Sequence, residues 1–569
     1  MIQLRLISVF LFFSLVLNAQ IQSTTLVTKS VSQYQKTDWN IEVTSTFTNP
    51  YDLNEITLDL ILTSPAGEKL VQPCFFESGT TGNQSLWKAR FTPREKGKYS
   101  YHFELKKASG EVSSSQINTF NVKPSKAKGF LNPNNLWTLK YDNGTLFRGI
   151  GENICWESRD DDDSKYFKKL HEDKRFNYSY MLKKLAANGG NFFRTWMIYW
   201  NLPVDWKKVQ NNSRYQNSNS YFNESGMKRM DELAQLCDSL GIHMMLALES
   251  HVGLMGSGWE TSNYNIANGG FAKTPTEFFA LPAARAQYKN KLRLMVARYG
   301  YSPSIGAWEF FNEVDNAMYN GGPDNQIPAE VVTDWYNEMS TFLKSIDPYN
   351  HIVTTSVSHR DIPGMNDLKN IDINQRHIYK NTAGIPATIL EYTAKHNKPY
   401  IIGESGYEWD WSKDFNAIAP EMDGDFRRAL WLGLFNPTPV LPMSWWWEFF
   451  ENRGMMSYFE RVKKVNDQMI SEGKGKFEIV VVKSLENGLE IYGVRCGKTT
   501  YVYVYNSSST KKPLQFQNLN WNKTKGNLEL LDTEVKKYSN EKFSISAEKV
   551  LTVDNVLIAP KQELVIRIK

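Results

Sequence analysis

The sequence lacks the features that mark several large classes of protein. Its 569 residues hold only four cysteines, whose wide spacing matches neither a disulfide framework nor a zinc site: Cys74, Cys155, Cys237 and Cys496. There is no glycine-rich phosphate loop and no basic run, so nothing favours a nucleotide or a nucleic acid. The formal charge of +5 is small for this length. We therefore predict no cofactor, no metal and no nucleic-acid partner, and leave open a mild preference for an anionic polymer.

Long apolar runs are also missing, apart from one at the N-terminus. Residues 6–17 form a short apolar segment that is preceded by Arg5 and followed by Ala19 before Gln20. The segment is too short to span a bilayer comfortably, and a small residue at this distance is typical of a signal-peptide cleavage site. We predict a signal peptide over residues 1–19, no membrane span, and a bacterial protein that is secreted, periplasmic or on the cell surface.

Aromatic residues are abundant, with 17 Trp, 28 Tyr and 31 Phe making up 13% of the chain. Aromatic faces pack against the apolar faces of sugar rings, and they also fill the cores of β-sandwiches. The abundance by itself leaves both interpretations open, so the organisation of the chain has to separate them.

The pattern of apolar residues divides the chain into three regions. Residues 24–125 alternate with period two, which predicts an immunoglobulin-like antiparallel β-sandwich with Trp87, Phe91 and Tyr99 in its core. Residues 474–569 return to this alternation and predict a second, C-terminal β-sandwich. Between them, residues 130–473 alternate apolar runs of strand length with amphipathic helical stretches, which is typical of a parallel α/β fold.

Eight strands can be counted in this central region: 145–156, 191–198, 242–250, 305–313, 351–358, 371–379, 399–405 and 438–448. Helical patterns separate most of them, although the fifth connection, 361–370, is too short for a long helix. Eight such units predict a (β/α)8 TIM barrel. An open doubly wound sheet would usually carry a glycine-rich first turn, and "GIGEN" is not one.

In a TIM barrel the catalytic groups lie at the carboxyl ends of the strands. The fourth strand ends in Asn312-Glu313, and the seventh ends near Glu404. These strands face each other across the barrel mouth, and two facing carboxyls are what glycosidic bond hydrolysis needs. Glu309 shares the alternating face of Glu313 but lies deeper, so we expect it to form a structural ion pair.

"WEFFNE" (308–313), "IIGESG" (401–406), "FFRTW" (192–196) and a His-x-Tyr on the sixth strand together resemble glycoside hydrolase clan A, the family 5 type in particular, and its β-mannanases. "LWKARFTPREKGKYSY" (86–101) resembles the module found ahead of such barrels. The resemblance implies that Glu313 is the general acid/base and Glu404 the nucleophile of a retaining enzyme, with carboxyls about 5–5.5 Å apart. Arg194 would keep Glu404 ionised, since a nearby cation lowers a carboxyl pKa, whereas the acid needs a raised pKa.

The resemblance also implies a set of substrate contacts. Asn312 would hold the sugar 2-hydroxyl, Tyr379 would donate to Glu404, and His377 would line the cleft near Glu313. On "SWWWEFFE" (444–451) a Trp would form the floor under the sugar. Strand alternation puts Trp445 and Trp447 on one face and Trp446 on the other, and we expect Trp447, nearest the carboxyl end of the strand, or its neighbour Trp446 to be this floor, with Trp445 in packing. Further candidate contacts are Glu448 at the rim, His251 and Trp259, while Glu451 is expected to face solvent. Glu249, Glu152 and Asn153 stay undecided, and the acidic run 159–165 is expected to be a solvated loop.

The leading hypothesis is thus a secreted retaining glycoside hydrolase that cleaves a β-linked polysaccharide, with β-1,4-mannan or β-1,4-glucan favoured and endo action expected. Alternatives are a hydrolase of an algal galactan of the agar or carrageenan type, or of another acidic glycan, and a non-catalytic polysaccharide-binding protein. The last would be expected to have lost one carboxyl, and both are present. The sequence does not indicate an oligomeric state.

Overall fold

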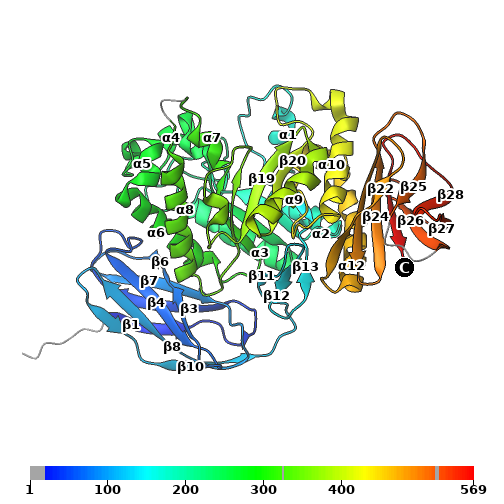
Figure 1. The fold of residues 1–569 in the computed structure, drawn as a ribbon. Helices are drawn as coiled ribbons and strands as arrows, with labels where there is room; N and C mark the ends of the chain where they lie inside the picture. The colour runs from blue at the N-terminus through cyan, green and yellow to red at the C-terminus, as the bar shows by residue number, and fades with distance from the viewer. Residues whose placement is uncertain (1–19, 323–325, 519–523) are drawn as a thin grey trace, which may run out of the picture.

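The computed structural model describes residues 20–322, 326–518 and 524–569, so the predicted signal peptide lies outside the described residues. Figure 1 shows a central α/β body with one sheet-rich region at each end of the chain. All four cysteines are buried free thiols. Within the described ranges, no helix has both the length and the hydrophobicity that a bilayer crossing would require.

The N-terminal region consists of two sheets packed over one core (blue in Figure 1). One has the order β1 (Ile21–Leu26), β3 (Thr37–Thr44), β7 (Gln84–Phe91), β6 (Phe75–Ser78). The other has the order β2 (Val31–Ser32), β10 (Asn118–Lys123), β8 (Gly97–Lys107), β4 (Ile56–Thr63), β5 (Lys69–Pro73), with β9 (Val112–Ser114) on β8. Buried and less buried residues alternate along β3 and β7, so every second side chain enters the core. Trp87, Phe91 and Tyr99 are buried there.

The central region contains seven parallel strands in sequence order: β14 (Gly151–Asn153), β15 (Phe192–Trp196), β16 (His243–Ser250), β17 (Ile305–Asn312), β18 (Val353–Val357), β19 (Ile373–Tyr379) and β20 (Tyr400–Gly406). The main connecting helices are α2 (Tyr178–Ala187), α3 (Glu224–Leu240), α6 (Pro282–Tyr299), α8 (Ala329–Ile346), α9 (Ile385–His396) and α10 (Ala419–Leu434). The fifth connection holds only the short η4 (Met365–Asp367). Local signals set the helix ends: in α3, Asn223 caps the first turn and Gly241 ends the helix at φ +65°.

The eighth predicted strand, 438–448, is not a regular strand. Its backbone still bonds to both edges of the sheet, because Gly149 N donates to Pro439 O at 2.8 Å and Ser405 N donates to Met443 O at 2.8 Å. Pro439 and Pro442 have no N–H group and cannot extend a ladder. The segment therefore joins β14 to β20 through isolated bridges, Gly149 with Val440 and Ser405 with Ser444.

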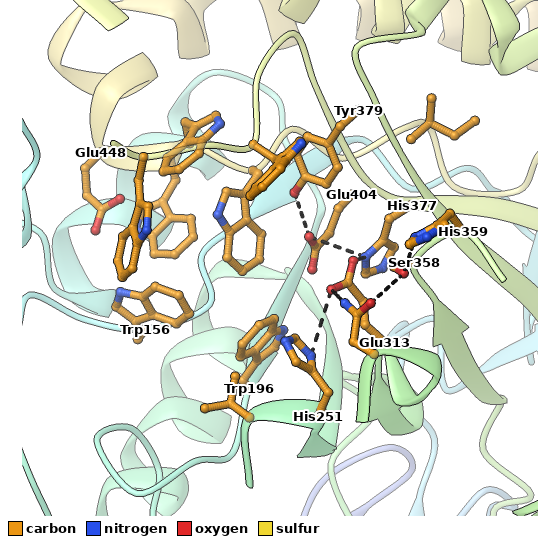
Figure 2. Close-up of a pocket in the computed structure, with 18 of the residues that line it drawn as sticks. Trp156, Trp196, His251, Glu313, Ser358, His359, His377, Tyr379, Glu404 and Glu448 are labelled. Atoms are coloured by element: carbon orange, nitrogen blue, oxygen red, sulfur yellow. Dashed lines mark hydrogen bonds and ion pairs between the residues drawn. The ribbon is translucent and has the colours of Figure 1, made fainter. Parts of the chain in front are cut away.

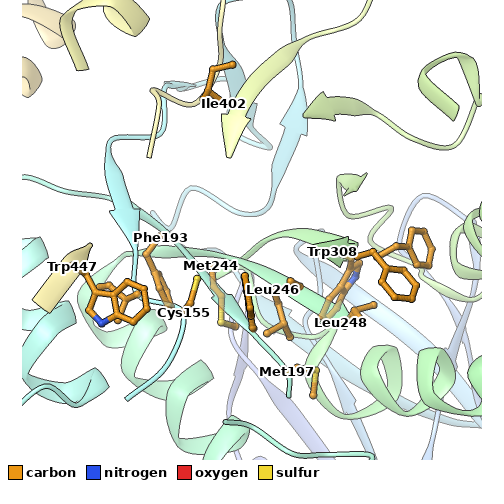
Figure 3. Packing of buried hydrophobic residues seen from close by; sticks show 14 of the residues in the cluster. Cys155, Phe193, Met197, Met244, Leu246, Leu248, Trp308, Ile402 and Trp447 are labelled. Carbon is orange, nitrogen blue, oxygen red and sulfur yellow. The ribbon is translucent and has the colours of Figure 1, made fainter. Parts of the chain in front are cut away.

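Apolar residues fill both sides of the central sheet. Inside lies a small cluster that includes Phe192, Met245, Ala307 and Ile401. Between the sheet and the helices lies the main core, and Figure 3 shows its members Phe193, Met244, Leu246 and Trp308. Neighbours in sequence, such as Phe192 and Phe193, belong to opposite cores because strand side chains alternate. The interior is thus packed at one end, which leaves the carboxyl ends of the strands to form the site.

The C-terminal region, for which a β-sandwich was predicted, forms a single hydrogen-bonded sheet. Its nine strands follow one antiparallel path: β21 (Phe477–Val480), β23 (Leu489–Cys496), β24 (Thr499–Asn506), β29 (Glu563–Ile568), β26 (Lys525–Asp532), β27 (Lys537–Ile545), β28 (Val550–Ile558), β25 (Lys512–Gln517) and β22 (Lys483–Ser484). Because β22 at one end also contacts β23 near the other, the sheet folds back on itself. It packs on the central region beside α10 and α12 (Tyr458–Gly473), where the rings of Trp431 and Tyr503 are stacked.

Candidate active site

Two glutamates meet at the carboxyl ends of β17 and β20. One carboxylate oxygen of Glu313, one of Glu404 and a ring nitrogen of His377 all lie within 4.8 Å of one another. His377, on β19, stands between the two acids, with Nδ1 at 2.7 Å from Glu313 Oε1 and 3.3 Å from Glu404 Oε2. Figure 2 shows the two carboxyls facing each other in the pocket. This separation matches the closely spaced class of glycosidase carboxyl pairs.

Glu404 is held by a guanidinium and a phenol. Arg194 on β15 donates from Nη1 to Glu404 Oε1 at 2.7 Å, and Tyr379 on β19 donates its hydroxyl to Oε2 at 2.7 Å. Arg194 also makes a two-point contact with Glu309, at 2.6 and 2.8 Å. Arg194 and Glu309 are fully buried, so this ion pair lies beneath the cavity and does not face it.

Asn312 is also turned towards Arg194. Its Oδ1 accepts from Arg194 Nη2 at 2.7 Å, and its Nδ2 donates to His251 Nδ1 at 3.1 Å. Asn312 is fully buried and is not among the residues that line the cavity, whereas His251 does line it. The predicted contact of Asn312 with a sugar hydroxyl therefore stays a prediction, because both ends of the amide are engaged with protein.

The position of Glu313 depends on a break in the strand. Phe310 and Phe311 both pack on Trp335 of α8, so the alternation of β17 fails here and Asn312 comes to the same side as Glu309. Glu313 then adopts the left-handed conformation, at φ +49°, which an L-residue with a side chain rarely occupies. The expectation that Glu313 continues the face of Glu309 by simple alternation is thus wrong.

Neutral donors surround Glu313. Asn316 Nδ2 donates to Glu313 Oε2 at 2.9 Å, and Ser358 Oγ donates to Asn316 Oδ1 at 3.0 Å. Ser356 Oγ accepts from the backbone N–H of Glu313 at 3.0 Å. His251 Nδ1 stands 3.9 Å from Glu313 Oε2. The acid therefore has no direct contact with Arg194, in contrast to Glu404.

Burial dominates the titration of the cluster. It raises the pKa of Glu313, with Asp315 adding to the effect and His251 opposing it. It also raises the pKa of Glu404, despite the opposing effects of His377, Arg194 and Tyr379. The second result differs from the expectation of a lowered value, because desolvation and the charge of Glu313 outweigh the cation. Burial lowers the pKa of His377 to about 4, so its ring is neutral near pH 7.

The two acids open into a cavity of about 1040 Å³ with aromatic walls. Trp445, Trp446 and Trp447 all line it, but their arrangement differs from the prediction. Trp447 begins the helix α11 (Trp447–Asn452), so the three do not alternate as in a strand. Trp446 and Trp447 are buried, whereas Trp445 is only partly buried. The backbone N–H of Trp445 donates to the carbonyl oxygen of Ser405, the residue after Glu404, and of the three tryptophans only Trp445 is partly exposed.

Other candidates lie elsewhere than expected. Trp259, on α4 (Gly256–Thr261), packs against the main core and does not line the cavity. Glu249 points outward to Lys291 of α6, at 2.6 Å. Glu451 does not face solvent, because it accepts a hydrogen bond from Tyr180 at 2.6 Å and its side chain is 7% exposed.

The remaining undecided residues belong to the framework. Asn153 donates to the carbonyl oxygens of Ser444 and Gly403, and so ties β14 to the segment 439–444 and to β20 beyond it. Glu152 is fully buried and does not line the cavity. In the acidic run, Asp162 pairs with Arg159 at 2.8 Å and with His171 at 2.9 Å, so this part of the loop is buried rather than solvated.

Sequence reasoning missed the loop after β20. Trp409 and Trp411 line the cavity and are 59% and 46% exposed. Lys380 lies over the Trp409 ring at 5.4 Å, and Arg159 lies over the Trp411 ring at 5.8 Å. The sequence signal that could have found this loop is "WDW" (409–411), which comes shortly after the strand that carries Glu404. Loops at this end of a scaffold often carry binding residues, so two tryptophans there indicate a substrate contact.

One group of possible metal ligands stands out among the described residues, Glu313, His377 and Glu404. Each of the three already has hydrogen-bond partners within the cluster or from Arg194, Tyr379 and Asn316. Their arrangement is that of a proton-transfer pair with a bridging imidazole, and we assign no metal to it.

Comparison with known proteins agrees with this geometry. Residues 164–419 match the family described as cellulase (glycosyl hydrolase family 5), and residues 30–106 match a domain of unknown function, DUF5060. The chain is 26% identical over 210 residues to mannan endo-1,4-beta-mannosidase A of Podospora anserina, which covers 33% of this chain and 52% of that protein. It is 26% identical over 200 residues to mannan endo-1,4-beta-mannosidase 2 of Arabidopsis thaliana, and this alignment covers 33% of this chain and 42% of that protein. The chain thus spans about half or less of these relatives.

The arrangement of the whole chain also has a counterpart. A crystal structure from Bacteroides vulgatus ATCC 8482, described as a candidate glycoside hydrolase, aligns with a TM-score of 0.64 at 15% identity, over 95% of this chain and 99% of that one. At this identity the similarity concerns the fold, and it includes both sheet-rich regions. The family assignment itself rests on the sequence match, and it applies to the matched part of the central region: residues 164–419 are of the glycoside hydrolase family 5 type.

Proposed function

We propose that this protein is a retaining glycoside hydrolase that cleaves β-1,4-mannan within the chain. The observation that carries the proposal is the pair of carboxyls, Glu313 and Glu404, with oxygens within 4.8 Å and with a cation on Glu404 alone. Two buried carboxyls this close do not ionise together without cost, so one proton is shared between them. Arg194 favours the charge on Glu404, which leaves the proton on Glu313.

The reaction then has two steps. In the first, a Glu404 oxygen bonds to the anomeric carbon as the bond from that carbon to the leaving oxygen breaks, and Glu313 gives its proton to that oxygen. In the second, Glu313 takes a proton from water, the water oxygen bonds to the anomeric carbon, and the bond to Glu404 breaks. Each step inverts the configuration of the anomeric carbon, so two steps restore the β configuration. Tyr379 holds Glu404 in line throughout.

Two further assignments belong to the same proposal. We interpret the seven strands and the segment 439–444 as a (β/α)8 barrel, because the segment bonds to both β14 and β20. We also propose that residues 1–19 direct export, on the basis of the apolar run after Arg5. A polymer too large to enter a cell is the natural substrate of an exported enzyme.

The relatives support mannan as the proposed substrate. The two named above are mannan endo-1,4-beta-mannosidases. The aromatic walls suit the apolar faces of neutral sugars, and the cavity of about 1040 Å³ exceeds what a single small ligand needs. β-1,4-Glucan has the same backbone linkage and is the main competing substrate.

The test is a panel of polysaccharides: β-mannan, glucomannan, cellulose, β-glucan, agarose and carrageenan. We expect the fastest release of reducing ends from β-mannan, with a range of oligosaccharide sizes from the start. Glu404→Gln and Glu313→Gln should each lose activity by a factor of roughly a thousand or more, while Glu391→Gln, an exposed residue of α9, should keep it. Cleavage of a galactan instead would overturn the substrate. If the wild type binds mannan without cleaving it, the proposal that the protein is an enzyme would be overturned.

A further inference from the structure

One end of the cavity is built by three separate segments. Trp156 and Arg159 lie on the long loop between β14 and α2, Trp411 lies on the loop after β20, and Glu448 lies on α11. The Arg159 guanidinium lies over the rings of Trp156 at 5.3 Å and Trp411 at 5.8 Å. Trp156 in turn packs edge-on against Trp447 at 4.9 Å. These contacts join the segments into one aromatic cup.

Polar groups in this cup are left without partners. Glu448 is only 3% exposed and lines the cavity, yet its Oε1 has no hydrogen-bond partner. Arg159 bonds to Asp162 through Nη2, but its Nε has no partner either. A buried carboxylate oxygen and a buried N–H group without partners cost free energy unless a ligand or water satisfies them. The cup therefore offers both an acceptor and a donor to whatever enters it.

The cup also has a defined place relative to the reaction. From Glu404 the wall continues through Trp445, which packs against Trp156 at 5.5 Å. From Glu313 the chain of contacts runs the other way, through Asn316 to Ser358 and His359. Figure 2 shows Trp156 and Glu448 at one side of the pocket and Ser358 and His359 at the other. The acid protonates the leaving group, so the cup lies on the side of the sugar that becomes bound to Glu404.

We propose that Glu448, Arg159, Trp156 and Trp411 form a subsite for a neutral sugar with adjacent free hydroxyls, located on the glycone side of the cleavage point. This inference rests on the proposed function for its orientation. The indole faces provide the apolar platform, Glu448 meets the hydroxyls, and Arg159 Nε donates to a sugar oxygen. A neutral sugar is favoured over a uronic acid or a sulfated sugar, because Arg159 already pairs with Asp162 and the unpartnered Glu448 oxygen would repel an added negative charge.

The test compares substrates that differ only in glycone length: 4-nitrophenyl β-mannoside, β-mannobioside and β-mannotrioside. In the wild type, kcat/KM should rise when the glycone becomes long enough to reach the cup. Glu448→Ala should reduce this rise by a factor of roughly ten to one hundred, with Glu448→Gln intermediate. Glu391→Gln on α9 is the matched surface control. An equal loss at every length, or the full rise in Glu448→Ala, would overturn the subsite.

A second readout does not depend on hydrolysis. Trp156 and Trp411 lie in the cup, so mannotriose should change the tryptophan fluorescence of the wild type, and glucuronate-containing oligosaccharides should not. Glu448→Ala should weaken the mannotriose response about tenfold or more in Kd. If the wild type binds mannotriose but cleaves no mannoside, the proposed function fails and the subsite stands. If mannotriose gives no response, or if Glu448→Ala binds it as tightly as the wild type, the subsite fails.

Discussion

At the scale of single residues, the site is defined by which acid touches which donor. Glu404 contacts a guanidinium and a phenol, whereas Glu313 contacts an amide and a neutral imidazole. That these two glutamates would lie close together was predictable from their places at strand ends. The left-handed backbone of Glu313 and the exposure of Trp445 instead of Trp447 were not. Both depend on how neighbouring side chains pack, which residue types alone do not specify.

Tyr379→Phe tests the control of the nucleophile. Loss of the hydroxyl removes a hydrogen bond that favours ionised Glu404, so the pKa of that carboxyl should rise further. Glu404 must be ionised to attack, so activity falls as pH drops through its pKa. The acidic limb of the kcat/KM profile should therefore move to higher pH by about one pH unit. Tyr538→Phe, in the C-terminal sheet, is the control. Superimposable acidic limbs for Tyr379→Phe and the wild type would contradict this role.

At the scale of elements, Arg194 connects four strands of the sheet. It is on β15 and bonds to Asn153 of β14, to Glu309 and Asn312 of β17, and to Glu404 of β20. Seven of the eight predicted strands exist, and the proline-rich eighth segment is irregular because each proline removes a ladder donor. Apolar runs reveal where a chain is buried, but not whether its backbone pairs continuously.

Glu309→Gln tests the ion pair under the site. The change leaves the Arg194 guanidinium buried with one charged partner fewer, and breaking such a pair costs about 3–5 kcal/mol of unfolding free energy. Urea unfolding followed by tryptophan fluorescence should show a clearly lower midpoint. Glu338→Gln is the matched control, because Glu338 pairs with Arg285 and Lys289 at the surface and should cost at most about 1 kcal/mol. Equal midpoints for the two variants would show that burial does not set the strength of the Arg194 pair.

At the scale of the whole molecule, the three-part order was readable from the change in apolar period along the chain. The contacts between the parts were not, because they join residues far apart in sequence. Arg298 of α6 pairs with Glu77 of the N-terminal region, and Arg428 of α10 pairs with Glu490 of the C-terminal sheet. The cup at the glycone end was unpredictable for the same reason. Arg159 lies over the Trp411 ring, although the two residues are some 250 positions apart in the sequence.

The most direct test of the central claim is to trap the nucleophile. A 2-deoxy-2-fluoro-β-mannosyl fluoride should react once, releasing fluoride and leaving the sugar bound, because the fluorine at C2 slows the second step. Peptide mapping by mass spectrometry should find the 2-deoxy-2-fluoromannosyl group on Glu404. A label on Glu313, or an enzyme that cleaves mannan to the α-anomer and takes no label, would contradict the account.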